Sequence, residues 1–122
     1  MLNERSPISF ADPLPSSVDV VVIGAGIIGI STARFLAQQG LSVAACEKGR
    51  VAGEQSSRNW GWIRKHGRDR AELPIMIESI QHWKSIANEL DEDIGFAQHG
   101  VMYLAETDAE LAERERWLSI AR

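Results

Sequence analysis

The sequence has one cysteine, no long apolar run and little net charge, and each shortage excludes a class of protein. Cys46 alone cannot form an internal disulfide, which excludes a disulfide-rich secreted domain and suits a reducing compartment. No segment approaches the roughly 18 consecutive apolar residues of a membrane-spanning helix. Residues 1–17 lack the apolar centre of a signal peptide. We therefore expect a cytoplasmic protein with no integral membrane segment.

The net charge of the chain and the spacing of its histidines argue against two further classes of function. A formal charge of −4 over 122 residues argues against a general nucleic-acid partner. His66, His82 and His99 are too widely spaced for the short ligand motifs of a metal site, so we expect no metal. Cys46 lies in an apolar run and is interpreted as a small core residue. No catalytic residue is assigned, and subunit partners stay open.

The region after the leader has the pattern of a strand, a helix and a second strand. Residues 18–23 are β-branched except at Asp19, and such a run is typical of a parallel strand buried on both faces. Residues 27–39 predict a helix that ends at Gly40, a suitable C-terminal cap. Residues 41–47 predict a second buried strand. Together these segments indicate one βαβ unit.

The second half of the chain predicts a loop, two helices and a strand. Residues 48–70 follow neither period and are interpreted as loop. A helix is expected from near Pro74. Its apolar stripe consists of Leu73, Met76, Ile77, Ile80, Trp83, Ala87 and Leu90. Residues 96–105 predict a strand with a turn or bulge at Gly100.

The last expected element is a helix that opens with a capping box. Thr107 and Glu110 have the spacing of that motif, and Glu110 and Arg114 form an oppositely charged pair four residues apart. The capping box predicts that the helix begins directly after Thr107.

The expected fold class is α/β, with three regions along the chain. Residues 1–17 form a flexible leader, 18–72 a Rossmann-like unit with its loop, and 73–122 the helix, strand pair and helix that begin a mixed α+β substrate-binding region. A doubly wound sheet normally has about five or six strands, and the sequence offers three or four. We therefore expect an incomplete domain, the N-terminal portion of a longer protein.

The turn between the first strand and helix carries a dinucleotide-binding pattern. Gly24, Gly26 and Gly29 fit G-x-G-x-x-G, with Ile27 at the helix start, where free N–H groups attract phosphates. Glu47 follows the second strand and suits the two hydroxyls of an adenosine ribose. The alternatives are an ordinary strand–helix turn and a surface charge at a strand end. The motif alone does not separate NAD from FAD.

The residues from "GAGIIG" through "EKGRVAGEQSSRNWGWIR" resemble the FAD-dependent D-amino-acid oxidase family, which includes glycine oxidase, sarcosine oxidase, amino-acid dehydrogenases and opine oxidases. The loop residues that carry this resemblance beside Glu47 are Gly53, Ser56, Ser57, Arg58, Asn59 and Gly61. The later "GFAQHGVMYLA" looks like the family's entry into its substrate-binding sheet. The resemblance implies FAD as cofactor.

The resemblance also implies a set of cofactor-binding residues. Ser56 and Ser57 would face the pyrophosphate and ribityl chain, Arg58 and Asn59 the flavin end, and Gly61 the ring. Simple turn chemistry is the alternative for the two serines. The full expected set is Gly24, Gly26, Ile27, Gly29, Glu47, Lys48, Ser56, Ser57, Arg58, Asn59 and Gly61.

Further cations and two tryptophans follow this loop. Among Arg64, Lys65, Arg68 and Arg70, Arg64 is the first candidate to reach the flavin face or a substrate carboxylate. The others are expected to form a solvated face or to pair with the acidic run at 89–93. Trp60 and Trp62 are expected in the core or lining a flavin cavity rather than stacking on nucleic-acid bases.

The resemblance implies a flavin-dependent oxidoreductase that oxidises the C–N bond of an amino acid or secondary amine by hydride transfer to FAD. The product imine would hydrolyse to a carbonyl compound and an amine or ammonia. Substrate would be bound mainly by residues beyond this chain, and "RNWGW" favours the opine- or secondary-amine-oxidising members. Two alternatives stay open: an NAD-dependent dehydrogenase, and a non-catalytic fragment that binds at most the adenylate half of a dinucleotide.

Overall fold

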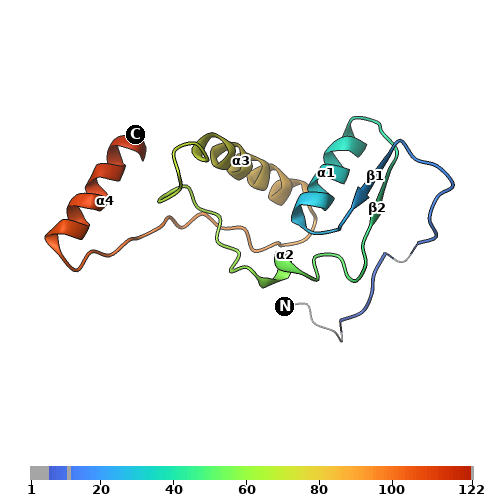
Figure 1. Ribbon diagram of the computed structural model, residues 1–122, viewed down its shortest axis with the longest axis horizontal. Coiled ribbons are helices and arrows are strands. Elements are labelled where there is room, and N and C mark those ends of the chain that lie inside the picture. Colours follow the sequence, from blue (N-terminus) through green and yellow to red (C-terminus); the bar gives the residue numbers. More distant parts are fainter. Residues whose placement is uncertain (1–5, 11, 122) are drawn as a thin grey trace. The chain divides into compact units, whose positions relative to one another are not determined.

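The computed structural model describes residues 6–10 and 12–121, and the chain divides into two units, Met1–Gly61 and Trp62–Arg122 (Figure 1). We call them unit 1 and unit 2. The expected leader includes residues 1–5 and 11, which lie outside the described residues, and its described part has no helix or strand. Within the described residues, no helix is both long enough and apolar enough to cross a membrane.

Unit 1 contains the predicted βαβ arrangement. Its elements are β1 (Val20–Ile23), α1 (Ile27–Gln38) and β2 (Val43–Cys46), followed by the short helix α2 (Gln55–Arg58). β1 and β2 pair in parallel, with Val20 opposite Val43 and Ile23 opposite Cys46. The parallel pairing confirms that α1 is the crossover between the strands, although both strands are shorter than the sequence predicted.

The start of the strand pair is held by a reciprocal contact between Asp19 and Ser42. The Asp19 carboxylate accepts hydrogen bonds from the Ser42 hydroxyl at 2.6 Å and the Ser42 backbone N–H at 2.8 Å. The carbonyl of Ser42 accepts the backbone N–H groups of Asp19 and Val20, both at 3.1 Å. The Ser42 side chain and then its N–H lower the pKa of Asp19. These bonds set the register where the two strands begin.

Gly40 terminates α1 as predicted. It has a φ of +87°, a conformation that costs glycine little. Its N–H donates to the carbonyl of Ala37 at 2.9 Å, and the N–H of Leu41 donates to the carbonyl of Leu36 at 3.3 Å. This pair of bonds is the Schellman motif, which satisfies the last carbonyls of the helix and turns the chain into β2.

The expectation that both strands are buried on two faces is wrong for the described chain. The side chains of Val21 and Ile23 in β1 are 56% and 90% exposed. A single crossover helix covers one face of a sheet, and burial of the opposite face requires further elements. The β-branched run therefore identified the strand correctly but overstated its burial.

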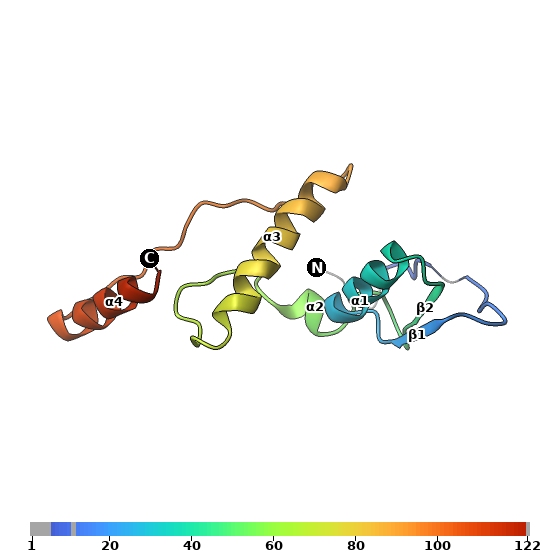
Figure 2. The ribbon, with the colours of Figure 1, turned by 90° about the horizontal axis from the view of Figure 1, so that it is seen from above.

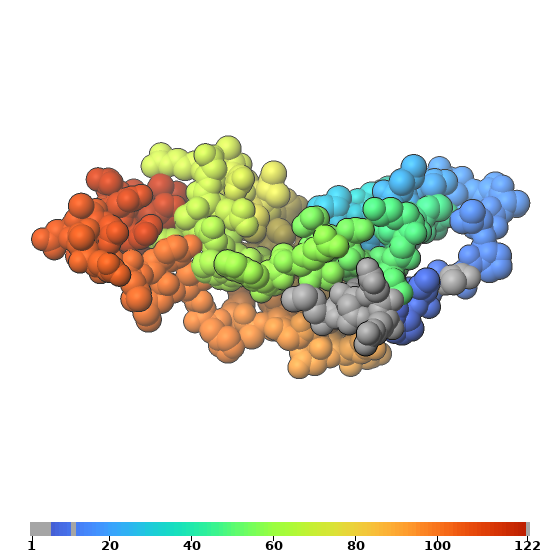
Figure 3. All heavy atoms as spheres, turned by 60° about the horizontal axis from the view of Figure 1, so that its bottom comes forward, coloured from blue at the N-terminus to red at the C-terminus, as the bar shows by residue number. Residues whose placement is uncertain are grey.

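The loop expected over 48–70 contains one helical turn. Residues 55–58 form α2, and the chain before it runs beside the start of α1, as the space-filling view shows in green and cyan (Figure 3). Four residues are too short to produce a helical period in the sequence, which is why the pattern predicted only loop. α2 is stabilised locally, since Ser57 donates both its N–H and its hydroxyl to the carbonyl of Glu54.

Unit 2 begins with the predicted helix α3 (Leu73–Glu89), with Pro74 in its first turn. Ile80, from the predicted apolar stripe, is buried at 7% exposure. Trp83 of the same stripe stacks on Phe96, with ring centroids 6.3 Å apart. In contrast, Ile75 lies outside the stripe and is 71% exposed. Ile77 and Leu90 of the stripe are also exposed, at 48% and 47%. The helical period thus predicted the helix and part of the face that it uses.

The strand expected over 96–105 is not formed. The chain from Leu90 to the last helix runs without regular secondary structure (Figure 2), and within the described residues β1 and β2 are the two strands. An alternating sequence can favour extended backbone, but a strand also needs a partner for its N–H and C=O groups. No described segment pairs with 96–105, so Gly100 is not a bulge in a sheet. It has a φ of +83°, and the backbone forms no turn there.

The last helix, α4 (Asp108–Ala121), begins with the predicted capping box. The N–H of Glu110 donates to the Thr107 hydroxyl at 3.3 Å, and the Glu110 carboxylate accepts the N–H groups of Glu106 and Thr107. These two N–H donors, Glu106 first, lower the pKa of Glu110, and the charge of Arg114 contributes in the same direction. The box therefore fixes the start of α4.

Gly29 allows α1 to pack against the end of β1. A Cβ at this position would lie 1.8 Å from the carbonyl oxygen of Gly24, far inside van der Waals contact. The obstacle is backbone, so it cannot be relieved by a rotamer change. Gly29 is thus required by the close approach of helix and turn.

We predict that Gly29→Ala lowers the free energy of unfolding of the full-length protein by about 3 kcal/mol or more, because α1 must move away from β1. Gly49→Ala is the matched control. A Cβ there lies 3.8 Å from Glu47 Oε1, an ordinary contact, and the expected change is below about 1 kcal/mol. Urea denaturation followed by circular dichroism measures both, and equal stabilities for the two variants would contradict the packing argument.

Candidate functional site

The glycine turn between β1 and α1 forms the centre of the candidate site. Gly24 has a φ of +99°, which permits the sharp turn out of the strand, and its N–H donates to the carbonyl of Cys46 at 2.8 Å. The side chain of Ala25, in the middle of the turn, is buried, with 2% of its surface exposed. The first N–H groups of α1 have no acceptor within the helix. The turn therefore presents backbone donors and the positive end of a helix dipole.

Glu47, which follows β2, lies against this turn. Its Oε2 accepts the N–H of Ala25 at 2.9 Å, and its Oε1 accepts the N–H of Gly49 at 2.9 Å. These bonds, that from Ala25 first, hold the pKa of Glu47 below its usual value of 4.5, against a smaller opposing effect of desolvation. The carboxylate is thus ionised at neutral pH and positioned at the carboxyl end of the sheet.

Ser56 is brought to the start of α1 by α2. Its hydroxyl oxygen accepts the N–H of Ile27 at 2.8 Å. A Cβ at Gly26 would lie 3.0 Å from the same oxygen, so the missing side chain of Gly26 allows this approach. A serine hydroxyl that accepts one hydrogen bond still has a proton to donate. Ser56 can therefore present one further donor at the helix N-terminus.

The remaining expected loop residues make local contacts instead. The Asn59 amide donates to the carbonyl of Ser56 at 2.7 Å, and its Oδ1 accepts the N–H of Gly61 at 2.6 Å. Ser57 bonds to the carbonyl of Glu54. In the described residues these groups stabilise the end of α2 and the turn at Gly61, which has a φ of +68°.

Glu54 joins the two expected cations of the loop, and the sequence analysis did not single it out. Its carboxylate lies 3.4 Å from Lys48 Nζ and 3.4 Å from Arg58 Nη2. All three side chains are largely exposed, so the pairs are screened by solvent and contribute little stability. The four-residue spacing of Glu54 and Arg58 was the available signal, because such pairs meet on a helix.

The structure thus brings together part of the expected set. Six residues converge on the glycine turn: Gly24, Gly26, Ile27, Gly29, Glu47 and Ser56. Ala25 was missed, and so was Ala52, whose N–H donates to the carbonyl of Ala25 at 2.9 Å. Both residues contribute backbone groups, so the types of their side chains do not indicate their role.

Neither Trp60 nor Trp62 is a core residue of the described chain, which was one of the two positions expected for them. Trp60, in unit 1, is 94% exposed, and Trp62, in unit 2, is 51% exposed. The other expectation, that they line a flavin cavity, stays a prediction. Arg64 lies over the Trp62 ring at 5.1 Å and donates to the carbonyl of His66. Arg68 pairs with Glu72 at 3.6 Å rather than with the acidic run at 89–93.

This chain is similar to one protein family and to several known proteins. Residues 19–122 match the family model described as DAO, FAD dependent oxidoreductase. Sarcosine oxidase subunit beta from an Arthrobacter species is 37% identical over 119 residues, which are 95% of this chain and 29% of that protein. Human mitochondrial sarcosine dehydrogenase is 29% identical over 115 residues, 90% of this chain and 12% of that protein.

Solved structures of L-amino acid deaminases are also similar to this chain. L-amino acid deaminase from Proteus vulgaris superimposes with a TM-score of 0.84 at 32% identity, over 91% of this chain and 26% of that chain. The Proteus myxofaciens deaminase in complex with anthranilate has a TM-score of 0.84 at 34% identity, over 90% of this chain and 25% of that chain. The chain thus spans less than a third of the length of each of these relatives.

The contacts of Glu47 predict that its protonation can be followed at two individual backbone amides. Since the pKa of Glu47 is lowered in the folded chain, its bonds to Ala25 and Gly49 are fully formed above about pH 4.5 and are lost as the pH falls through the lower folded pKa. The amide proton shifts of both residues should titrate together, with a midpoint below 4.5. Nuclear magnetic resonance of labelled protein measures this.

The control for this titration is Glu47→Gln, which cannot ionise and should abolish the transition at both amides. A midpoint above 4.5, or independent titration of the two amides, would contradict the bridging geometry.

Proposed function

The chain belongs to the DAO family of FAD dependent oxidoreductases, and we propose on this premise that unit 1 holds the adenosine and pyrophosphate half of FAD. The observation that carries the proposal is the family match over residues 19–122. The geometry of the glycine turn supports it, since groups suited to a pyrophosphate and to the hydroxyls of a ribose lie there. An NAD-dependent enzyme is disfavoured because the matched family takes FAD.

The pyrophosphate is proposed to lie at the N-terminus of α1. Gly26 leaves room for the Ser56 hydroxyl beside the turn. The first-turn N–H groups and the helix dipole attract negative charge. Ser56 already accepts the N–H of Ile27 and would donate its own proton to a phosphate oxygen. The hydroxyl would thereby extend the line of helix donors by one group.

Glu47 is proposed to bind the two ribose hydroxyls. Each of its oxygens accepts one backbone N–H in the structure. A carboxylate has about four acceptor sites, so capacity for two further donors is left. Because the lowered pKa keeps the group ionised, it would repel a 2′-phosphate. This donor and acceptor set fits an unphosphorylated adenosine ribose.

Lys48 and Arg58 are proposed to act through charge rather than fixed bonds. Both are paired with Glu54 at 3.4 Å, so the three side chains together carry one net positive charge near the loop. Ser57, Asn59 and Gly61 are proposed to shape the path of the chain along the flavin end of the cofactor. Their local hydrogen bonds, which hold the loop in one conformation, support this proposal.

The whole protein is proposed to oxidise the C–N bond of an amino acid or secondary amine. When bound, FAD supplies the hydride acceptor for this reaction. The support comes from relatives that are named as sarcosine oxidase, sarcosine dehydrogenase and L-amino acid deaminase. Within this chain, Arg64 is proposed to face the substrate carboxylate, because the Trp62 ring and the His66 carbonyl hold it in one orientation.

Visible absorbance of the full-length protein after purification tests the cofactor. We expect a yellow protein that releases FAD on denaturation, while residues 1–122 alone are expected to be colourless since they hold one half of the cofactor. A folded full-length protein that stays colourless with added FAD and binds NAD would overturn the proposal.

Variants of Glu47 and Ser56 test the site itself. Glu47→Ala is expected to weaken FAD binding by about 10- to 100-fold and Ser56→Ala by about tenfold, as hydrogen bonds to charged groups are removed. Equilibrium titration of the apoprotein with FAD measures both. Glu78→Ala and Ser85→Ala on α3 are the matched controls and should stay within about twofold of wild type. Unchanged affinity in the Glu47 and Ser56 variants, at unchanged melting temperature, would reject the assigned roles.

A further inference from the structure

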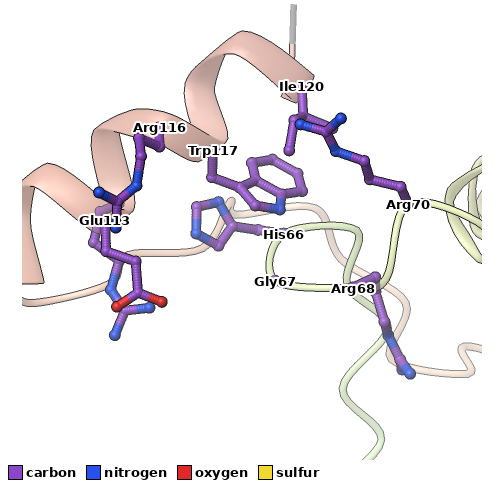
Figure 4. A pocket seen from close by; sticks show the side chains of 9 residues that line it. His66, Gly67, Arg68, Arg70, Glu113, Arg116, Trp117 and Ile120 are labelled. Atoms are coloured by element: carbon purple, nitrogen blue, oxygen red, sulfur yellow. The ribbon is translucent and has the colours of Figure 1, made fainter.

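Unit 2 contains a pocket of about 510 Å³ that the dinucleotide site does not use. It lies between the loop at 66–70 and α4 (Figure 4). Its lining contains four arginines and one acidic residue, Arg68, Arg70, Arg114, Arg116 and Glu113. The pocket therefore carries three net positive charges, although the whole chain has a charge of −4. Such a concentration of one sign is a specific local arrangement rather than a general property of the surface.

Two rings that line this pocket, those of His66 and Trp117, belong to a stack of three rings. The His66 ring lies 4.2 Å from the Tyr103 ring and 4.3 Å from the Trp117 ring, measured between centroids. Arg114 lies 5.3 Å from the centre of the Tyr103 ring. The Tyr103 hydroxyl also donates to the carbonyl of His66. These contacts join the loop, the extended segment and α4 within unit 2, so the cations around them are positioned by a common support.

Two of the arginines that line the pocket have no acidic partner within the described residues. Arg68 is paired with Glu72, but no acidic side chain lies within 4.0 Å of the charged groups of Arg70 or Arg116 in that part of the chain. Two cations that lack an acidic partner at a pocket favour the binding of an anion.

The arrangement of the arginines indicates what kind of anion fits. Arg70 and Arg116 lie on opposite sides of the Trp117 ring in Figure 4. A ligand that meets both must carry negative charge at more than one place. Guanidinium groups bind phosphate oxygens through paired N–H donors, and the volume is suitable for a small molecule.

We propose that this arginine pocket binds a small molecule with a diphosphate group or two separate phosphates. The site consists of residues other than those assigned to FAD, and the proposal does not depend on the flavin function. Arg70 and Arg116 provide the main contacts, and the ring stack holds together the loop and the helix that line the pocket.

Isothermal titration with inorganic pyrophosphate, using full-length protein saturated with FAD, tests the proposal. Pyrophosphate is expected to bind at least about tenfold more tightly than inorganic phosphate, because only the former spans both arginines. Arg70→Gln combined with Arg116→Gln should weaken pyrophosphate binding by about tenfold or more. Lys65→Gln combined with Lys84→Gln removes the same charge elsewhere in unit 2 and should leave it within about twofold.

Three results would overturn the proposal: no pyrophosphate binding by wild type at about 10 mM, equal affinity in the arginine double variant and wild type, or an equal loss in the lysine control. Glu47→Ala separates this site from the FAD site. It should weaken FAD binding without changing the pyrophosphate affinity measured at saturating FAD. If the protein proved not to bind FAD, the titration would be made without it and would retain the same outcomes.

Discussion

The close approach of α1 to the turn after β1 is the constraint on which the rest of unit 1 depends. At Gly29 the helix is so near the Gly24 carbonyl that no side chain fits between them. This contact fixes the direction in which the N-terminus of α1 points. Only in that direction do the N–H groups of Ala25 and Ile27 reach Glu47 and Ser56. The chemistry of the turn is therefore a consequence of backbone packing, and the polar side chains complete a geometry that glycine makes possible.

The sequence alone predicted the elements whose signals come from residues close together in the chain. The periodic stripe predicted α3, the capping box predicted the start of α4, and the glycine pattern predicted the strand–turn–helix order. The segment at 96–105 failed because strand formation depends on a partner elsewhere in the chain. Similarly, the β-branched residues of β1 indicated a strand correctly but said nothing of what covers it.

The candidate site was predictable to the extent that it depends on side-chain type. Glu47 and Ser56 were expected from the sequence and lie at the turn, where they contact backbone donors. In contrast, the contributions of Ala25 and Ala52 are made by main-chain groups, which any residue could supply. Glu54 went unnoticed because its role is to join Lys48 and Arg58, and that role exists only once α2 has formed.

The contacts that define unit 1 lie between residues 19 and 56, and this has a consequence for the order of events during synthesis. The Asp19–Ser42 bonds span 23 residues and the Ile27–Ser56 bond spans 29. The residues that make these contacts are all synthesised before unit 2. At about 5–20 residues per second, this unit can close within seconds of emerging from the ribosome. It does so with the apolar side chains of Val21 and Ile23 still facing water. The nascent chain thus displays a surface for chaperones while the remainder is still being made.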